Sequence, residues 1–367
     1  MGFSPASPAH VTEIDHRADP SAWARELGVS REAVELYLAS DVIDLHVDSF
    51  IWQRLLGRNP LERQRPLPFL PGVALGHADL PRLREAAIGG ATWIVTTNPL
   101  RDAADRVHAF LENMRALDAL LASAPDRVTL VRTADEYRTA RAAGRHAAFV
   151  GIQGGNAFEH DLGALDALEP RFLLLVTLMH LTHSELGVAS APFAPFGDGG
   201  LSPRGVELVH KLNELRVFVD LAHASPRTFW GALAAHDRTL PVVVSHTGVM
   251  GVHRHWRNLD DAQLRAVANS GGVVGVIFHS AYLGDPMFRG RLETIVRHLE
   301  HVRDTLGDDF PALGSDWDGF IVTPRDMPTC LELPRLVECM LRRGWRPEAV
   351  RKTLGQNFLR ALRELRG

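Results

Sequence analysis

The 367-residue sequence predicts an α/β protein folded as a (β/α)₈ barrel of the TIM type. Two observations support this fold. Eight short apolar runs rich in β-branched residues alternate with amphipathic stretches, a pattern typical of a parallel sheet that helices cover on both faces. Histidine, aspartate and glutamine stand at the ends of these runs, where barrels of this kind build their active sites.

The eight predicted strands are spread along most of the chain. They cover residues 41–48, 91–97, 146–153, 171–180, 216–223, 241–247, 271–279 and 310–318. The clearest amphipathic stretches between them are residues 79–88, 105–124, 202–216, 260–271 and 291–307. An open doubly wound sheet is the alternative, but no GxGxxG follows the first strand to favour a nucleotide-binding version.

The segments outside this alternation define the expected domain organisation. Residues 1–40 predict an N-terminal helical extension, and residues 41–367 predict a single barrel domain that ends in one or two closing helices. The proline-rich segment 49–80 is long for a loop between a strand and a helix, so we expect it to cover the site.

Composition excludes several classes of function. Lys and Arg number 40 against 44 Asp and Glu, the charges are interspersed, and no basic stripe suggests a nucleic-acid partner. The sequence contains no apolar run of about 18 residues, so it predicts no membrane span. Lys211 and Lys352 are the only lysines, so mechanisms that need a Schiff-base or carbamylated lysine are disfavoured. Cys330 and Cys339 form no CxxC, and together with an N-terminus that lacks an apolar stretch they predict a cytoplasmic protein.

The strand-end histidines suggest a metal site. His46 and Asp48 stand two residues apart in the first predicted strand, so both side chains face the same side. An imidazole and a carboxylate in this arrangement suit a Zn²⁺-type ion, although a hydrogen-bonded strand-end pair is the simpler interpretation. His223 and His246 each end a further strand, and three such strand ends together favour the metal site.

Candidate catalytic groups follow the eighth and fourth strands. A carboxylate beside activated water can take its proton and pass it to a leaving amine. Gly314 and Ser315 place Asp316 at the transition from strand to loop, which ranks it before Asp318, and an acidic turn is the alternative. His183, just past the fourth strand, is a candidate donor to a developing oxyanion or an ordinary loop histidine.

The order of the short motifs resembles a known family. The motifs HVD, QGG, LTH, DLAH, SHT, WRN and GSDWDG are similar to those of the zinc-dependent renal or membrane dipeptidase family, peptidase family M19, over roughly residues 41–360. The resemblance implies a barrel of the metal-dependent hydrolase type, with a two-metal centre that hydrolyses dipeptides. It also suggests a homodimer.

The resemblance also implies a role for each matching residue. His46 and Asp48 would hold one metal ion, and His223 and His246 would hold the other. The remaining roles are polarisation of the scissile carbonyl or stabilisation of the oxyanion, binding of the terminal carboxylate by a guanidinium fork, and proton transfer from the attacking water. They fall to His183, Arg257 and Asp316, respectively.

The sequence departs from the family at Gln153, where the resemblance places a glutamate that bridges both metals. An amide has one neutral coordinating oxygen, whereas a carboxylate has two anionic ones. Because two nearby dications repel strongly, we expect one Zn²⁺ to bind tightly and a second to bind weakly or not at all. Glu159 and His160, in the next loop, are alternative ligands.

These observations predict a cytoplasmic metallohydrolase that cleaves the amide bond of dipeptides or dipeptide-like small molecules. The expected partner is the small-molecule substrate, with neither nucleic acid nor membrane. The alternative is a relative of the dipeptidases that binds metal or ligand but has altered or lost catalysis because its binuclear site is incomplete. A lyase or isomerase on the same barrel is a third interpretation.

Overall fold

The computed structural model describes residues 13–67, 70, 72–98, 100–191 and 199–367. Eight of its strands form a closed parallel ring, in which β1 pairs with both β2 and β9 and the ring closes between β2 and β4. The predicted (β/α)₈ barrel is therefore confirmed. The strands of the ring are β1 (Ile43–Val47), β2 (Gly90–Thr96), β4 (His146–Gln153), β5 (Leu175–Thr177), β6 (Phe218–Asp220), β7 (Val243–Thr247), β8 (Val273–Val276) and β9 (Pro311–Leu313).

A further strand lies outside the ring and was not predicted. Strand β3 (Val128–Leu130) pairs only with the first half of β4, where Val128 lies opposite His146. Its three residues form too short an apolar run to be recognised as a strand from the sequence. Each of the eight predicted strands, in contrast, overlaps one strand of the ring.

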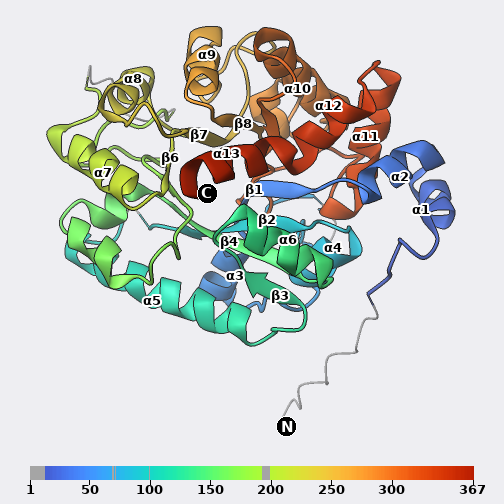
Figure 1. Ribbon diagram of the computed structural model, residues 1–367, viewed down its shortest axis with the longest axis horizontal. Coiled ribbons are helices and arrows are strands. Elements are labelled where there is room, and N and C mark those ends of the chain that lie inside the picture. Colours follow the sequence, from blue (N-terminus) through green and yellow to red (C-terminus); the bar gives the residue numbers. More distant parts are fainter. Residues whose placement is uncertain (1–12, 68–69, 71, 99, 192–198) are drawn as a thin grey trace.

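Helices surround the ring of strands (Figure 1). Several begin directly after an Asp, Ser or Thr whose side chain accepts a hydrogen bond from the first turn, which explains where the sequence starts them. The α-helices are α1 (Pro20–Leu27), α2 (Arg31–Leu38), α3 (Ser49–Leu56), α4 (Leu80–Glu85), α5 (Ala103–Ala122), α6 (Ala134–Ala142), α7 (Pro203–Glu214), α8 (Pro226–Ala235), α9 (Asp261–Asn269), α10 (Leu292–Leu306), α11 (Leu333–Arg342), α12 (Pro347–Arg351) and α13 (Asn357–Arg366). Shorter helical segments are η1 (Gly155–Phe158), η2 (Leu162–Ala167), η3 (Ser280–Leu283), η4 (Cys330–Glu332) and the π-helical η5 (Lys352–Gln356).

Helix α13 closes one end of the barrel. Phe358 packs against Phe149 of β4 and Phe218 of β6, with ring centroids 5.5 and 6.2 Å apart, in a hydrophobic cluster shared with the strands. The guanidinium of Arg366 donates to the carbonyl of Leu173, which precedes β5. These contacts lie at the amino ends of the strands, and in Figure 1 the helix crosses the middle of the ring. The carboxyl ends of the strands therefore form the open mouth.

The N-terminal helices pack on the last third of the chain. Trp23 of α1 and Tyr37 of α2 are buried in the main hydrophobic core. The backbone N–H of Ser30 donates to Glu338 of α11 at 2.9 Å, and Figure 1 shows α1 and α2 beside that helix. Residues 13–40, the described part of the segment predicted as a helical extension, contain α1 and α2, which share the core with the barrel.

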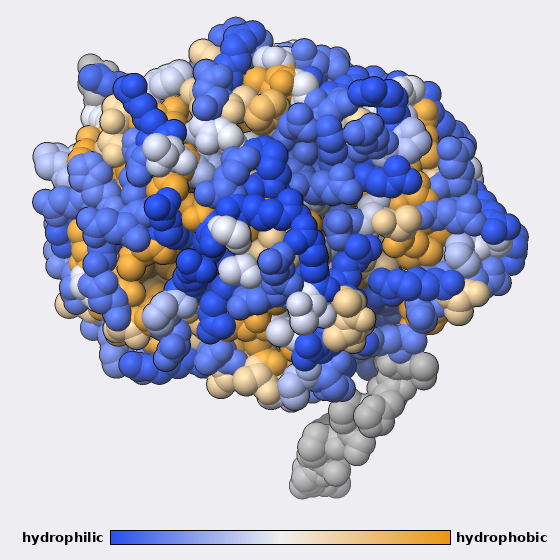
Figure 2. Space-filling model, in the orientation of Figure 1, coloured by the Kyte–Doolittle hydropathy of each residue, from blue (hydrophilic) through white to orange (hydrophobic). Residues whose placement is uncertain are grey.

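The surface is predominantly hydrophilic on the face that Figure 2 shows, with hydrophobic residues in small patches between the charged ones. Among the described residues, no helix combines the length and the apolar character that crossing a membrane would require.

Candidate active site

A cavity of about 760 Å³ opens at the carboxyl ends of the strands. Its walls include residues at the ends of all eight strands of the ring or in the loops that follow them, among them Asp48, Gln153, His223 and Asp316. His46 and His246 are fully buried beneath it. Because parallel strands all end at the same side of a barrel, residues far apart in the sequence meet here. The cavity volume is in the range that small-molecule sites occupy, roughly 300–1,000 Å³.

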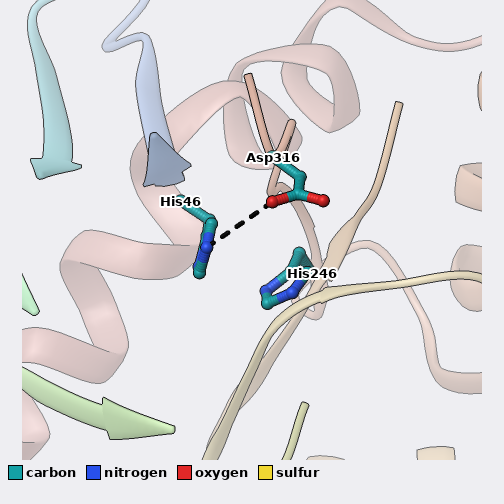
Figure 3. Close-up of side chains that lie close together, drawn as sticks. All are labelled: His46, His246 and Asp316. Atoms are coloured by element: carbon teal, nitrogen blue, oxygen red, sulfur yellow. Dashed lines mark ion pairs between the residues drawn. The ribbon is translucent and has the colours of Figure 1, made fainter. Parts of the chain in front are cut away.

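Two carboxylates surround one histidine at the bottom of the cavity. His46 Nε2 lies 3.2 Å from Asp48 Oδ2 and 3.6 Å from Asp316 Oδ1. Candidate ligand atoms of His46, His246 and Asp316 all lie within 4.8 Å of one another, and Figure 3 shows these three side chains converging. Burial alone would lower the pKa of His46, but the two carboxylates outweigh it and raise that pKa. A positive charge is therefore favoured at this point.

His46 and Asp48 were expected to face the same side of their strand, but that strand is irregular. The pairing of β1 with β2 shifts register between Asp44 and Val47, so simple alternation does not hold there. The two side chains nevertheless meet, and Thr96 of β2 fixes the carboxylate by donating its hydroxyl to Asp48 Oδ1 at 2.7 Å.

A second group of side chains gathers around His223 and His246. Their Nε2 atoms are 2.9 Å apart, and the amide nitrogen of Gln153 lies 3.1 Å from the first and 3.3 Å from the second. Burial lowers the pKa of both histidines well below the ordinary value. A half-turn of the Gln153 amide replaces its NH₂ with the carbonyl oxygen, the only amide atom able to coordinate a cation.

Residues behind the histidines fix the direction of their lone pairs. Asp220 accepts the hydroxyl hydrogen of Ser245 at 2.6 Å, so the Ser245 oxygen is left to accept from other groups. Nδ1 of His246 lies 2.8 Å from that oxygen and Nδ1 of His46 lies 3.4 Å from it. With their hydrogens on Nδ1, both rings turn the Nε2 lone pair into the site. This arrangement is common behind metal-binding histidines, so the residues fit a divalent cation.

Asp316 and Asp318 point in different directions, which distinguishes the two candidates. Asp316 faces the cavity, and burial followed by the nearby Asp48 raises its pKa well above the ordinary value, despite His46. Asp318 instead accepts hydrogen bonds from the Ser49 hydroxyl at 2.6 Å and from a backbone N–H at 2.8 Å. It therefore joins the loops around the cavity and does not line it.

Three of these residues adopt left-handed backbone conformations. His223, Asp316 and Asp318 have φ values of 62°, 64° and 66°. Residues with side chains seldom adopt this region, and such strain gathers at functional sites. His223 and Asp316 lie in the loops after β6 and β9, and both side chains line the cavity.

Arg257, in the loop after β7, places a positive charge beside the cavity. The side chain is buried, and Nη2 donates to the carbonyl oxygen of His246 at 2.7 Å. Burial lowers its pKa to about 10, although Asp316 acts in the opposite direction. Its Nε hydrogen has no partner among the described residues. This cation at the edge of the cavity can bind a carboxylate of a ligand.

The structure does not bring His183 to the cavity, whereas it does bring His180. His183 Nδ1 accepts the backbone N–H of Ala189 at 3.0 Å, and this bond holds the loop after β5. His180 lines the cavity, and its ring centroid lies 4.9 Å from that of His223. Burial lowers its pKa to about 4. Its position at the end of the predicted strand 171–180 was the available signal, because His183 lies three residues beyond that end.

The two alternative ligands lie away from the cavity. Glu159 forms an ion pair with Arg106 and accepts the backbone N–H of Glu185 at 3.2 Å. His160 is half exposed and lies 3.7 Å from the Glu185 carboxylate. Neither residue is placed to compensate for the missing charge at Gln153.

Comparison with known proteins places this site in context. The sequence model of the membrane dipeptidase family, peptidase family M19, matches residues 30–366. Two solved structures share 26% sequence identity and a TM-score of 0.79 over 89% of this chain. One is dipeptidase AC, a metallopeptidase of family M19, of which 98% is covered. The other is a metallopeptidase from Rhodobacter sphaeroides, of which 99% is covered, with a bound phosphinate mimic of the dipeptide L-Ala-D-Ala.

A third structure shows the same fold at lower identity. The probable dipeptidase PvdM from Pseudomonas aeruginosa is 19% identical, with a TM-score of 0.80 over 93% of this chain and 98% of the other.

Proposed function

The chain belongs to the membrane dipeptidase family, peptidase family M19, and is a metal-dependent hydrolase of dipeptides, and on this basis we propose the residues that carry the reaction. The proposed reaction is hydrolysis of the amide bond of a dipeptide or a dipeptide-like small molecule by water. The observation that carries it is the convergence of buried histidines and carboxylates at the bottom of one cavity at the carboxyl ends of the barrel strands.

The proposed cofactor is Zn²⁺, because imidazole nitrogen and carboxylate oxygen are its usual ligands. When bound, such an ion supplies Lewis acidity toward the scissile carbonyl and toward water. His46 and Asp48 would hold one ion, and His223 and His246 would hold the other. The carbonyl oxygen of Gln153 is a weaker, neutral contact, so we propose one tight ion and a second that binds weakly.

Asp316 is the proposed proton carrier. Its carboxylate faces the cavity 3.6 Å from His46 Nε2, within the group of side chains that would surround the attacking water. It would accept a proton from that water and return it to the leaving amine, which acts as a neutral leaving group once protonated.

His180 and Arg257 are the proposed substrate-positioning groups. His180 replaces His183 in the role of hydrogen-bond donor to the substrate oxygen, because it lines the cavity and its buried Nδ1 has no partner among the described residues. Arg257 would bind the C-terminal carboxylate, for which its unpartnered Nε is available.

Several broader features belong to the same proposal. We infer a barrel domain of residues 41–367 with residues 1–40 as its extension, and a homodimer, which light scattering would test. A cytoplasmic location is consistent with Cys330 and Cys339, which are both free thiols.

The test combines metal content with turnover. Purified protein would be assayed by elemental analysis and then with a panel of dipeptides in the presence of Zn²⁺, Mn²⁺ or Co²⁺. Asp316→Asn should lower kcat by about 10²–10⁴-fold while the protein still folds and binds metal. Full activity of this variant would contradict the assignment of Asp316.

A further inference from the structure

Two arginines line the cavity wall beside β1 and β2. They are Arg54 of α3 and Arg101 in the loop after β2. Arg54 Nη1 donates to the carbonyl oxygen of Thr96 at 2.7 Å, and the hydroxyl of the same threonine donates to Asp48. One residue therefore connects Arg54 to the bottom of the cavity, where the reaction is proposed to occur.

Neither of these arginines forms an ion pair in the part of the chain that the structure describes. Neither guanidinium has a carboxylate oxygen within 4.0 Å among the described residues, and the one printed contact of Arg54 is with the neutral carbonyl of Thr96. Burial, and then the proximity of Arg101, lowers the pKa of Arg54, while Asp48 acts in the opposite direction. Two adjacent cations facing a cavity form a binding site for an anion.

One acidic residue shares this wall and has to be considered. Glu112 of α5 also lines the cavity, but its side chain is 61% exposed and lies 3.0 Å from His108. Asn98 and Asn113 are neutral polar residues that line the same cavity. The two guanidiniums therefore outnumber Glu112 on this wall, and the 3.0 Å contact of Glu112 is with a histidine on its own helix.

The order of the strands sets the direction of a bound dipeptide. Arg257 follows β7, and in the closed ring β7 is four strands away from β2 in either direction. Arg257 and Arg101 thus lie on opposite sides of the mouth. On the proposed function, the C-terminal carboxylate is held beside Arg257, so the N-terminal residue of the substrate extends toward β1 and β2.

We propose that the cavity selects dipeptides whose N-terminal residue is acidic, and that Arg54 and Arg101 bind its side-chain carboxylate. This inference rests on the proposed function and adds the substrate class. A guanidinium group matches the two oxygens of a carboxylate. The wall offers two guanidiniums, and a neutral side chain of the substrate would leave both without an ionic partner.

The test compares pairs of substrates that differ only in charge. Glutamyl-alanine and glutaminyl-alanine would be assayed in L,L and L,D forms, together with the reversed pair alanyl-glutamate and alanyl-glutamine. We expect kcat/KM for glutamyl-alanine to exceed that for glutaminyl-alanine by roughly tenfold or more, the effect of a hydrogen bond to a charged group. The reversed pair should show no such preference. Phosphinate analogues of the first pair should differ similarly in Kd by calorimetry.

Variants connect the preference to the two arginines. Arg101→Gln should reduce the ratio between the first two substrates, and the double variant Arg54→Gln/Arg101→Gln should bring it close to one. Arg115→Gln removes a positive charge from the exposed side of α5 and serves as the matched control, so it should leave the ratio unchanged.

Three results would overturn the inference. They are equal kcat/KM and Kd for the first pair, a preference for lysyl-alanine, which would assign the wall to Glu112, and a preference that survives in the double variant. Equal hydrolysis of the charged and neutral substrates rejects the selectivity alone. If no dipeptide is hydrolysed and no phosphinate binds, the proposed function itself is rejected and the inference falls with it.

Discussion

The Nε2 atoms of His223 and His246 lie 2.9 Å apart, and the neutral amide of Gln153, 3.1 and 3.3 Å away, contacts both. Burial lowers the pKa values of both rings well below the ordinary value, which favours their neutral forms. Two lone pairs that meet in a buried site are favourable neighbours only when a cation or a hydrogen is shared between them. Because the two nitrogens lie so close together, the charge of residue 153 decides how well this centre holds a cation.

Gln153→Glu should raise the metal stoichiometry toward two ions per chain. At about 4 Å, two dications repel by on the order of 16 kcal/mol at an effective dielectric near 20, and a bridging carboxylate offsets part of that repulsion. Calorimetric titration of the metal-free protein, with elemental analysis after dialysis, measures the change.

Gln356→Glu is the matched control for this substitution, since it adds the same charge at an exposed position. It should leave the stoichiometry unchanged. Two tightly bound ions in the unmodified protein, with no effect of Gln153→Glu, would show that the charge argument is wrong. In that case the alternative of an incomplete binuclear site would also lose its basis.

Arg257→Ala should raise KM for free dipeptides by the equivalent of about 2–4 kcal/mol, because it removes a charge-assisted pair with the terminal carboxylate. For dipeptides with an amidated C-terminus, KM should rise much less. Steady-state kinetics on both substrate series provides the measurement. Equal losses would assign Arg257 a structural role through its hydrogen bond to His246.

His180→Ala should lower kcat by about 10²–10³-fold, since it removes a donor aimed at the developing oxyanion. His183→Ala is the matched comparison, because the two histidines belong to the same segment and only the first lines the cavity. We expect the second variant to retain most of the activity. Single-turnover kinetics, with circular dichroism to verify folding, would distinguish them, and the reverse order of effects would restore His183 to the site.

Lowering the pH from about 6.5 to about 4 should destabilise the metal-free protein through buried histidines that do not line the cavity. His298 accepts from the N–H of Val249 and its Nε2 faces the carbonyl of Leu283, so only the neutral ring satisfies both contacts. Burial lowers its pKa to about 4, and the same holds for His146. The unfolded chain takes up these protons first, so the free energy of unfolding falls as the pH drops.

Each of the two histidines contributes about 3 kcal/mol over that range, from 1.36 kcal/mol per pKa unit. His298→Gln keeps a donor and an acceptor but does not titrate, so urea unfolding across this pH range should show a shallower dependence. His108→Gln, at an exposed position of α5, is the control. An unchanged slope in His298→Gln would mean that His298 does not carry the pH dependence.

The barrel could be predicted from the sequence because the patterns that mark its strands are local features of the chain. Eight apolar runs are long enough to recognise, whereas β3 is three residues of ordinary composition whose pairing with β4 depends on tertiary contacts. His180 and His183 illustrate the same limit within the site. Three residues separate them, and only the point where β5 leaves the ring decides which one faces the cavity.

Arg54 and Arg101 could not have been singled out from the sequence pattern. All but two of the 40 basic residues are arginines, so Arg54 and Arg101 have no distinguishing signal in the chain. Their significance comes from the cavity wall that they share and from the lack of an ion pair with any described residue, which are properties of the folded protein. Asp220 and Ser245 likewise acquire their role behind His246 only through the packing of β6 against β7.

The left-handed backbone at Asp316 has a consequence for any effort to make this protein more heat-resistant. A residue with a side chain in that conformation costs about 1–2 kcal/mol relative to glycine. Asp316→Gly would also remove a buried carboxylate from beside Asp48, so the variant should melt at a higher temperature than the parent. A screen that rewards survival of heating, and does not assay turnover, would therefore enrich proteins that have exchanged their proposed proton carrier for an easier fold.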